Sequence, residues 1–146
     1  RVLFRSNIEE FLKIENINIK KTLIGDGPQL DEYKLKYPNA KFLGRKNKYQ
    51  IANELRKHDV FAWPSLTDTF GLVVLEGMAC GLPVAAFDND VNSYIIKDGV
   101  SGFLTEKNFE LAIQQAYLLN KEDAVNQAKK FSWESATDQF LENLIV

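Results

Sequence analysis

Two carboxylates, Asp68 and Glu76, lie in one apolar segment that also contains glycines. If residues 72–80 form a helix, the neighbours of Glu76 three and four positions away are all apolar: Leu72, Val73, Ala79 and Cys80. No Lys or Arg lies between Lys57 and Lys97 to neutralise this carboxylate locally. Because a desolvated carboxylate is costly unless it gains hydrogen bonds, we expect Glu76 to accept them from paired ligand hydroxyl groups. The alternative is a buried Glu satisfied by backbone N–H groups or by a distant Arg.

A turn that could hold an anion precedes the same helix. Asp68 lies in the loop, and Gly71 lets the backbone approach a ligand closely where the helix begins. The first N–H groups of a helix have no intrahelical acceptor, and the helix dipole adds about 0.3–1 kcal/mol for an anion placed there. The turn therefore predicts a site for a phosphate or a sugar oxygen. The alternative is an Asp or Thr side chain that caps a purely structural helix.

Apolar runs and helical patterns alternate along the chain. The runs predict strands at 17–24, 40–43, 60–63, 83–87 and 102–104. Helical spacing predicts helices at 7–14, 29–37, 49–57, 72–80, 108–119, 121–130 and 133–144, with Pro28 at the first position of the second helix. Apolar strands separated by helices indicate an α/β fold with a doubly wound, Rossmann-like parallel sheet covered by helices on both faces.

Such a sheet binds ligands at the carboxyl ends of its strands. We therefore expect the functional loops after Leu43, Trp63 and Phe87 and around Gly25.

Composition narrows the classes of function. The 146 residues suit one globular domain, and the net charge of -2 comes without a basic stripe, which argues against nucleic acid as a partner. The short basic cluster at 45–48 is interpreted as a solvated loop. The single cysteine, Cys80, excludes an internal disulfide and a cysteine-cluster metal site, and we expect it to be a small buried core residue.

The chain shows no signal peptide, and its longest apolar stretch, 70–87, is interrupted by Glu76, two glycines and Pro83. We expect a cytoplasmic protein.

The run 67–84, Thr-Asp-Thr-Phe-Gly-Leu-Val-Val-Leu-Glu-Gly-Met-Ala-Cys-Gly-Leu-Pro-Val, closely resembles the signature of glycosyltransferase family 4, which has the GT-B fold. In that family two acidic residues flank a Phe-Gly turn, as Asp68 and Glu76 do here. Further segments resemble the family in order and spacing, so that the resemblance covers nearly the whole chain: 25–28, 42–44, 95–104 and 131–134.

The resemblance implies a fold of two Rossmann-like domains with a cleft between them. The C-terminal domain binds the nucleotide-sugar donor and the N-terminal domain binds the acceptor. Residues 1–146 resemble the donor domain only, and residues 1–6 are too few for a complete first strand and its loop. We therefore expect a truncated first strand, an absent acceptor domain that would be the chain's partner and could supply peripheral membrane contact, and a fragment that is inactive alone.

The resemblance also implies roles for individual residues. Glu76 would bind the ribose hydroxyls, and Asp68 would face the donor sugar. Backbone N–H groups of 70–73 would hold the sugar and the diphosphate, which assigns donor binding to Phe70, Gly71, Leu72 and Val73. Arg1 would contact the diphosphate, Gly44 and Arg45 would lie beside the base, and Gly25 belongs to the turn after the second strand.

The implied reaction transfers a hexose from a UDP-sugar or GDP-sugar with retention of configuration and needs no metal. The two acidic residues would position the donor and would not act as the acid and nucleophile of a glycosidase.

Two departures from the family pattern keep alternatives open. Ser6 occupies the position of a Lys that usually contacts the diphosphate, and Asp68 replaces a more usual Glu. Losing that Lys would remove a contact of about 1.5–3 kcal/mol. A non-catalytic nucleotide-sugar-binding module or a gene remnant is therefore one alternative. A flavodoxin-like interaction domain is another, although it leaves Glu76 unexplained.

Overall fold

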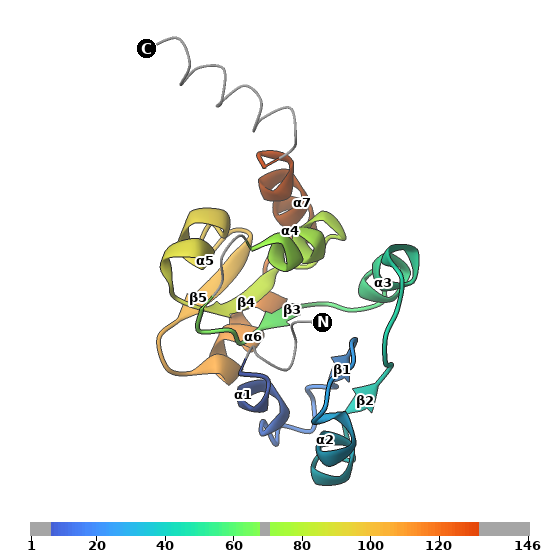
Figure 1. The fold of residues 1–146 in the computed structure, drawn as a ribbon. Helices are drawn as coiled ribbons and strands as arrows, with labels where there is room; N and C mark the ends of the chain where they lie inside the picture. The colour runs from blue at the N-terminus through green and yellow to red at the C-terminus, as the bar shows by residue number, and fades with distance from the viewer. Residues whose placement is uncertain (1–6, 68–70, 132–146) are drawn as a thin grey trace.

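The computed structural model describes residues 7–67 and 71–131, and within them five parallel strands form two sheets (Figure 1). The smaller sheet pairs β1 with β2, and the larger has the order β3-β4-β5. In register, Leu23 lies opposite Phe42, and Ala85 lies between Ala62 and Phe103. The strand bounds are β1 Thr22–Leu23, β2 Lys41–Phe42, β3 Phe61–Trp63, β4 Val84–Phe87 and β5 Gly102–Thr105.

Helices connect and cover these strands: α1 Glu9–Leu12, α2 Leu30–Lys36, α3 Lys48–Leu55, α4 Leu72–Ala79, α5 Asp90–Ile95, α6 Phe109–Tyr117 and α7 Lys121–Lys129. Asparagine side chains cap four of them by accepting a hydrogen bond from a backbone N–H group: Asn47, Asn89, Asn108 and Asn120. At α3 the side chain of Gln50 also accepts from the Asn47 N–H, which completes a capping box.

Two hydrophobic clusters lie on opposite faces of β4, as alternation along a strand requires. The first cluster contains Ala85 and Phe87 together with side chains of β1, α1, α2 and α6. The second contains Val84 and Ala86 together with side chains of β3, α4, α5 and α7. All four residues of β4 are buried, so this strand is the centre of the larger sheet.

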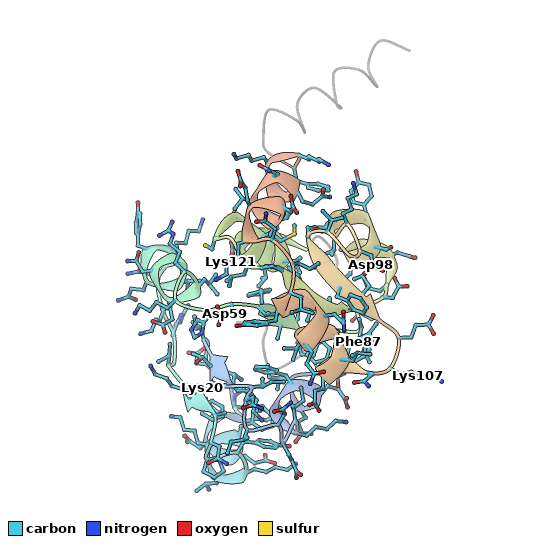
Figure 2. All side chains as sticks on the ribbon, turned by 180° about the vertical axis from the view of Figure 1, so that it is seen from behind. Lys20, Asp59, Phe87, Asp98, Lys107 and Lys121 are labelled. Carbon is cyan, nitrogen blue, oxygen red and sulfur yellow. The ribbon has the colours of Figure 1, made fainter. Side chains whose placement is uncertain are left out.

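Long-range polar contacts fix the flanking helices. The Lys121 ammonium group of α7 donates to the His58 carbonyl at 3.1 Å and to the Asp59 carboxylate at 3.3 Å, just before β3 (Figure 2). The Lys21 ammonium group donates to the Leu12 carbonyl at 2.6 Å and so holds the end of α1 beside β1. Burial lowers the pKa of Lys21.

The fold class is confirmed, and the described strands form two parallel sheets in which β1 and β3 are not paired with each other. The strand predicted at 17–24 is reduced to Thr22–Leu23, because a turn in which the Ile19 N–H donates to the Asn16 carbonyl precedes it. The capping residue of α2 is Gln29, so Pro28 precedes the helix and does not begin it.

Further differences concern shorter features. The helix α5 was not predicted, because its six residues are too short a window for a helical period to be recognised. Cys80 is partly exposed and is not a core residue, since it lies at the end of α4. The helix predicted at 133–144 lies outside the described residues. Within the described ranges, no helix is long and apolar enough to cross a bilayer.

Candidate nucleotide-binding site

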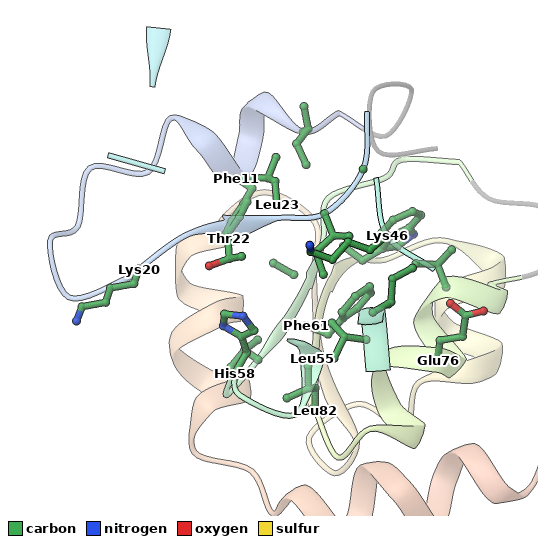
Figure 3. Close-up of a pocket in the computed structure, with 18 of the residues that line it drawn as sticks. Phe11, Lys20, Thr22, Leu23, Lys46, Leu55, His58, Phe61, Glu76 and Leu82 are labelled. Atoms are coloured by element: carbon green, nitrogen blue, oxygen red, sulfur yellow. The ribbon is translucent and has the colours of Figure 1, made fainter. Parts of the chain in front are cut away.

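An apolar cavity of about 360 Å³ lies between the two sheets (Figure 3). Its lining comes from β1, β3 and the helices α1, α3 and α4. Phe11 and Leu23 contribute from the first part of the chain, Leu55 from α3 and Phe61 from β3. Glu76 of α4 lines the same cavity.

Two glycines adopt left-handed conformations just after β1 and β2. Gly25 has φ 136° and Gly44 has φ 69°, values that favour glycine over residues with a side chain. The Gly25 N–H donates to the Gly44 carbonyl at 2.8 Å, which joins the two turns. A Cβ atom on Gly44 would meet no atom within 4 Å, so the backbone there is open to a ligand. The structure therefore brings these two predicted residues together at the carboxyl edge of the smaller sheet.

Three cations and one carboxylate line the cavity. Lys20 precedes β1, Arg45 and Lys46 follow β2, and Glu76 comes from α4, some thirty residues later in the chain. The interpretation of 45–48 as a solvated loop is wrong for Lys46, which is partly buried, although Arg45 is exposed. Side chains of opposite charge from distant segments thus line one cavity, as recognition of a ligand with both phosphate and hydroxyl groups requires.

The start of α4 has a left-handed glycine as its capping residue. Gly71 has φ 63°, and the alternative caps Asp68 and Thr69 lie outside the described residues. A Cβ atom at this position would lie 2.1 Å from Ile95 Cδ1. The first intrahelical bond runs from the Leu75 N–H to the Gly71 carbonyl at 3.0 Å, which leaves the N–H groups of 72–74 without helical acceptors.

Glu76 differs from expectation in its environment. Its side chain is exposed, because α4 buries Val74, Gly77 and Met78 and turns the side containing Glu76 outward. The expected desolvation of this carboxylate is therefore wrong, since its helical neighbour Leu72 is itself 64% exposed. No hydrogen bond or ion pair joins the Glu76 side chain to another residue in the described part of the chain. Its carboxylate oxygens are thus available to a ligand.

The predicted site residues fall into three groups. Gly25, Arg45, Val73 and Glu76 line the cavity. Gly44, Gly71 and Leu72 lie in the turns and the helix start described above and are not part of the lining. Arg1, Asp68 and Phe70 lie outside the described residues.

Sequence reasoning missed the contribution of α5, whose Ile95 packs against Gly71. It also missed the apolar character of the cavity, although the runs that form its walls were recognised as strands. Among the residues described, no group of three or more His, Cys, Asp or Glu side chains could hold a metal ion.

Comparison with known proteins gives the site its context. The family model described as "Glycosyl transferases group 1" matches residues 5–134. An uncharacterized glycosyltransferase of Methanocaldococcus jannaschii is 33% identical over 136 residues, which cover 83% of this chain and 39% of the relative. The D-inositol 3-phosphate glycosyltransferase of Mycolicibacterium smegmatis is 33% identical over 108 residues, covering 68% of this chain and 25% of that protein. The chain thus spans well under half the length of these relatives.

Solved structures agree with the observed fold. The Anabaena protein HepE in complex with UDP-glucose superposes with a TM-score of 0.70 at 25% identity, over 96% of this chain and 44% of that one. The sucrose-phosphate synthase of Thermosynechococcus elongatus has a TM-score of 0.79 at 22% identity, over 97% of this chain and 43% of that one. The family match, which covers most of the sequence, and the shared α/β architecture lead to one conclusion: this chain belongs to the group 1 glycosyltransferase family.

Proposed function

We propose that this chain is the C-terminal, donor-binding domain of a retaining glycosyltransferase of the GT-B fold, and that it binds a UDP-sugar or GDP-sugar at the carboxyl edge of its strands. The observation that carries the proposal is the convergence of Arg45 and Glu76 on one cavity beside the start of α4, where Gly71 is the capping residue. The relative HepE, solved with UDP-glucose, supports this class of ligand.

Glu76 would accept hydrogen bonds from the two ribose hydroxyls. Its side chain lines the cavity and has no partner among the described residues, so these bonds replace water and not protein contacts. Hydrogen bonds to a charged group contribute about 1.5–3 kcal/mol. The carboxylate is therefore the strongest single determinant of affinity that we assign.

The diphosphate would lie at the start of α4. The N–H groups of Leu72 and Val73 have no helical acceptors, and the positive end of the helix dipole faces the same place. As the sugar leaves, negative charge grows on the diphosphate, and these fixed donors stabilise it without reorganisation. Arg45 and the open backbone at Gly44 would flank the base. Arg1, Asp68 and Phe70 keep the roles that the family resemblance implies.

The complete enzyme would carry an acceptor domain in a further segment of polypeptide and transfer a hexose to a glycan, lipid or protein, with any membrane contact residing in that domain. We expect no metal requirement, since the donors at α4 and Arg45 supply the positive charge.

Calorimetric titration with UDP, GDP, UDP-glucose and GDP-mannose tests the donor site. We expect Glu76→Gln to weaken binding of the preferred nucleotide by about 10–100-fold. The control is Glu106→Gln, because Glu106 is an exposed carboxylate on a loop outside the cavity. Equal nucleotide affinities of Glu76→Gln and the unmodified chain would refute the assignment. Loss of nucleotide binding when EDTA removes divalent cations would contradict the expectation of no metal requirement.

A non-catalytic binding module remains the competing function, because Ser6 replaces a diphosphate-contacting Lys. An assay of slow hydrolysis of the bound nucleotide-sugar, measured as release of free sugar, distinguishes a transferase from a non-catalytic module. Hydrolysis that falls with Glu76→Gln favours a transferase. Tight binding without any turnover, also when an acceptor domain of a relative is fused to the chain, favours the module.

A further inference from the structure

We propose that the indole N–H of Trp63 donates a hydrogen bond to the bound nucleotide, at an oxygen of the phosphate nearest the ribose. Trp63 would then be a binding residue that recognises the junction between nucleoside and diphosphate, in addition to the residues assigned above. The inference rests on the proposed donor site and adds one contact within it.

An unpaired buried donor is the observation from which the inference starts. Trp63 is the last residue of β3, is 1% exposed and lines the cavity. Its Nε1 has no hydrogen-bond acceptor among the residues that the structure describes. A buried donor without an acceptor is costly, and buried polar groups in proteins are nearly always paired. Because this side chain borders a cavity, a ligand in that cavity can supply the acceptor.

Packing around the indole holds the ring in place. The rings of Phe61 and Trp63 are stacked, with their centroids 6.2 Å apart and their planes inclined by 16°. Trp63 also belongs to the second hydrophobic cluster, together with Val74 and Met78 of α4. A ring confined in this way loses little further freedom when a ligand binds. A Phe side chain could fill an apolar core without an N–H that needs a partner, so packing alone does not explain the N–H group of Trp63.

The polar groups that share the cavity with Trp63 define the chemistry of the ligand. The indole N–H can only donate a hydrogen bond, as can the Lys46 ammonium group, whereas the ionised Glu76 carboxylate can only accept one. All three side chains line the cavity. A ligand that pairs with all of them must carry both acceptor oxygens and hydroxyl donors. A nucleoside phosphate has both kinds of group, and a hydrocarbon chain has neither.

The position of these residues along α4 favours one phosphate. Val73 and Glu76 are three positions apart and therefore lie on one side of the helix. Both line the cavity, and Val73 packs against the cluster that contains Trp63. In the proposed arrangement the diphosphate lies at the start of α4 and the ribose lies at Glu76, about one turn further along. The junction between ribose and diphosphate then passes Val73, and we assign to Trp63 the phosphate at that junction.

An NMR titration of the unmodified chain tests this contact. The sequence contains two tryptophans, and Trp133→Phe assigns the two indole N–H signals. UMP and uridine are added separately, or GMP and guanosine if the chain prefers a GDP-sugar. We expect UMP to move the Trp63 signal downfield and to slow its exchange with solvent, because a new acceptor is bound. Uridine lacks the phosphate and should leave both quantities nearly unchanged.

Affinities measured by calorimetry give a second test. Trp63→Phe keeps an aromatic ring and removes the donor, so it should weaken UMP binding by about tenfold and uridine binding by less than about twofold. Glu76→Gln should weaken both ligands, since both carry the ribose hydroxyls. The matched control is Phe61→Leu, which reduces a neighbouring aromatic side chain without removing a donor and should affect both ligands alike. Melting temperatures identify any variant that does not fold, in which case the NMR titration decides.

The possible failures are distinguishable. The assignment of Trp63 is overturned if UMP binds without moving its indole signal, or if UMP and uridine move that signal alike. It is also overturned if a folded Trp63→Phe chain loses affinity for both ligands equally. Those results leave the donor site itself standing as long as Glu76→Gln weakens binding. If neither UMP nor UDP binds, and neither GMP nor GDP, the donor-site proposal fails and the assignment of Trp63 fails with it.

Discussion

The two halves of the molecule, built on the smaller sheet β1-β2 and the larger sheet β3-β4-β5, both have parallel strands but differ in strand length and burial. In the larger sheet, β4 is paired on both sides and every one of its residues is buried. In the smaller sheet, β1 and β2 comprise two residues each, and large apolar side chains of this half lie open to solvent: Ile17 at 90%, Leu35 at 86% and Tyr49 at 84%. Apolar sequence is therefore not sufficient for a long strand, because the apolar run 17–24 forms a strand only at Thr22–Leu23.

The halves are held together mainly through helices. The Asn16 side chain donates to the Glu110 carboxylate of α6 at 2.9 Å, and α1 packs on the same core cluster as α6. Among the described residues, no strand of the smaller sheet pairs with a strand of the larger one, and the two sheets share a hydrophobic cluster. We expect it to open first when the protein is destabilised.

The largest loss of unfolding free energy should come from a substitution in the half built on the larger sheet. Met78 is fully buried in the second hydrophobic cluster and does not line the cavity. We expect Met78→Ala to cost about 2–5 kcal/mol of unfolding free energy, measured by urea denaturation. A loss below that range would show that this core is as loosely packed as the other half.

The corresponding truncation to Ala in the half built on the smaller sheet should cost less unfolding free energy. Leu23 is 7% exposed and borders the cavity, so its truncation enlarges a space that already exists. We expect Leu23→Ala to cost about 2 kcal/mol, at the low end for such changes, because the cost depends on how far the site already lacks contacts. A cost equal to that of Met78→Ala in the original chain would remove the distinction between the halves.

Substitution of one helix-capping Asn in each half tests whether the two halves differ in stability at the level of single helices. Asn47 caps α3, of which only Leu55 is buried, whereas Asn108 caps α6, which buries four residues. Each substitution by Ala should cost about 1 kcal/mol of helix stability. We expect Asn108→Ala to lower the global melting temperature, and Asn47→Ala to speed hydrogen exchange mainly within α3. Identical responses of the two variants would contradict local opening of the smaller half.

The smallest effect concerns the exposed pair that joins α1 to α2. The Lys36 ammonium group lies 2.7 Å from Glu9 Oε1, and its hydrogen bond lowers the pKa of Glu9 while the same bond raises the pKa of Lys36. The stabilisation is therefore present from above the ordinary carboxylate pKa to below the ordinary lysine pKa. It disappears as the pH falls through the lowered pKa of Glu9, and also as it rises through the raised pKa of Lys36. Glu9→Gln should reduce the melting temperature slightly at pH 7 and not at all at pH 2, with Glu106→Gln as the control.

The sequence predicts the parts of this fold that depend on local pattern. Apolar runs identified β3 and β4, and the helix after Gly71 was located to within a residue of its observed start. Local pattern did not predict which strands pair, because the division of the described strands into two sheets depends on contacts between segments that are distant along the chain.

The site shows the same division. Family resemblance predicts site roles for Gly25, Gly44, Arg45 and Glu76, and the structure places Gly25, Arg45 and Glu76 at one cavity, with Gly44 in the adjoining turn. The exposure of Glu76 was predicted wrongly, because apolar neighbours on a helix imply burial only if another element covers them. Lys46 is partly buried, whereas its neighbour Arg45, which lines the same cavity, is exposed, so a charged loop segment does not reveal which of its side chains is covered.

The close contact between Gly71 and Ile95 gives α5 an indirect influence on recognition. Because Ile95 Cδ1 occupies the space that a side chain at position 71 would need, the orientation of the first α4 amides depends on a residue that does not line the cavity. A change of volume at position 95 would tilt those amides without altering any ligand-contacting side chain. Searches for variants with an altered ligand preference should therefore include α5 residues around Ile95 as well as the residues that line the cavity.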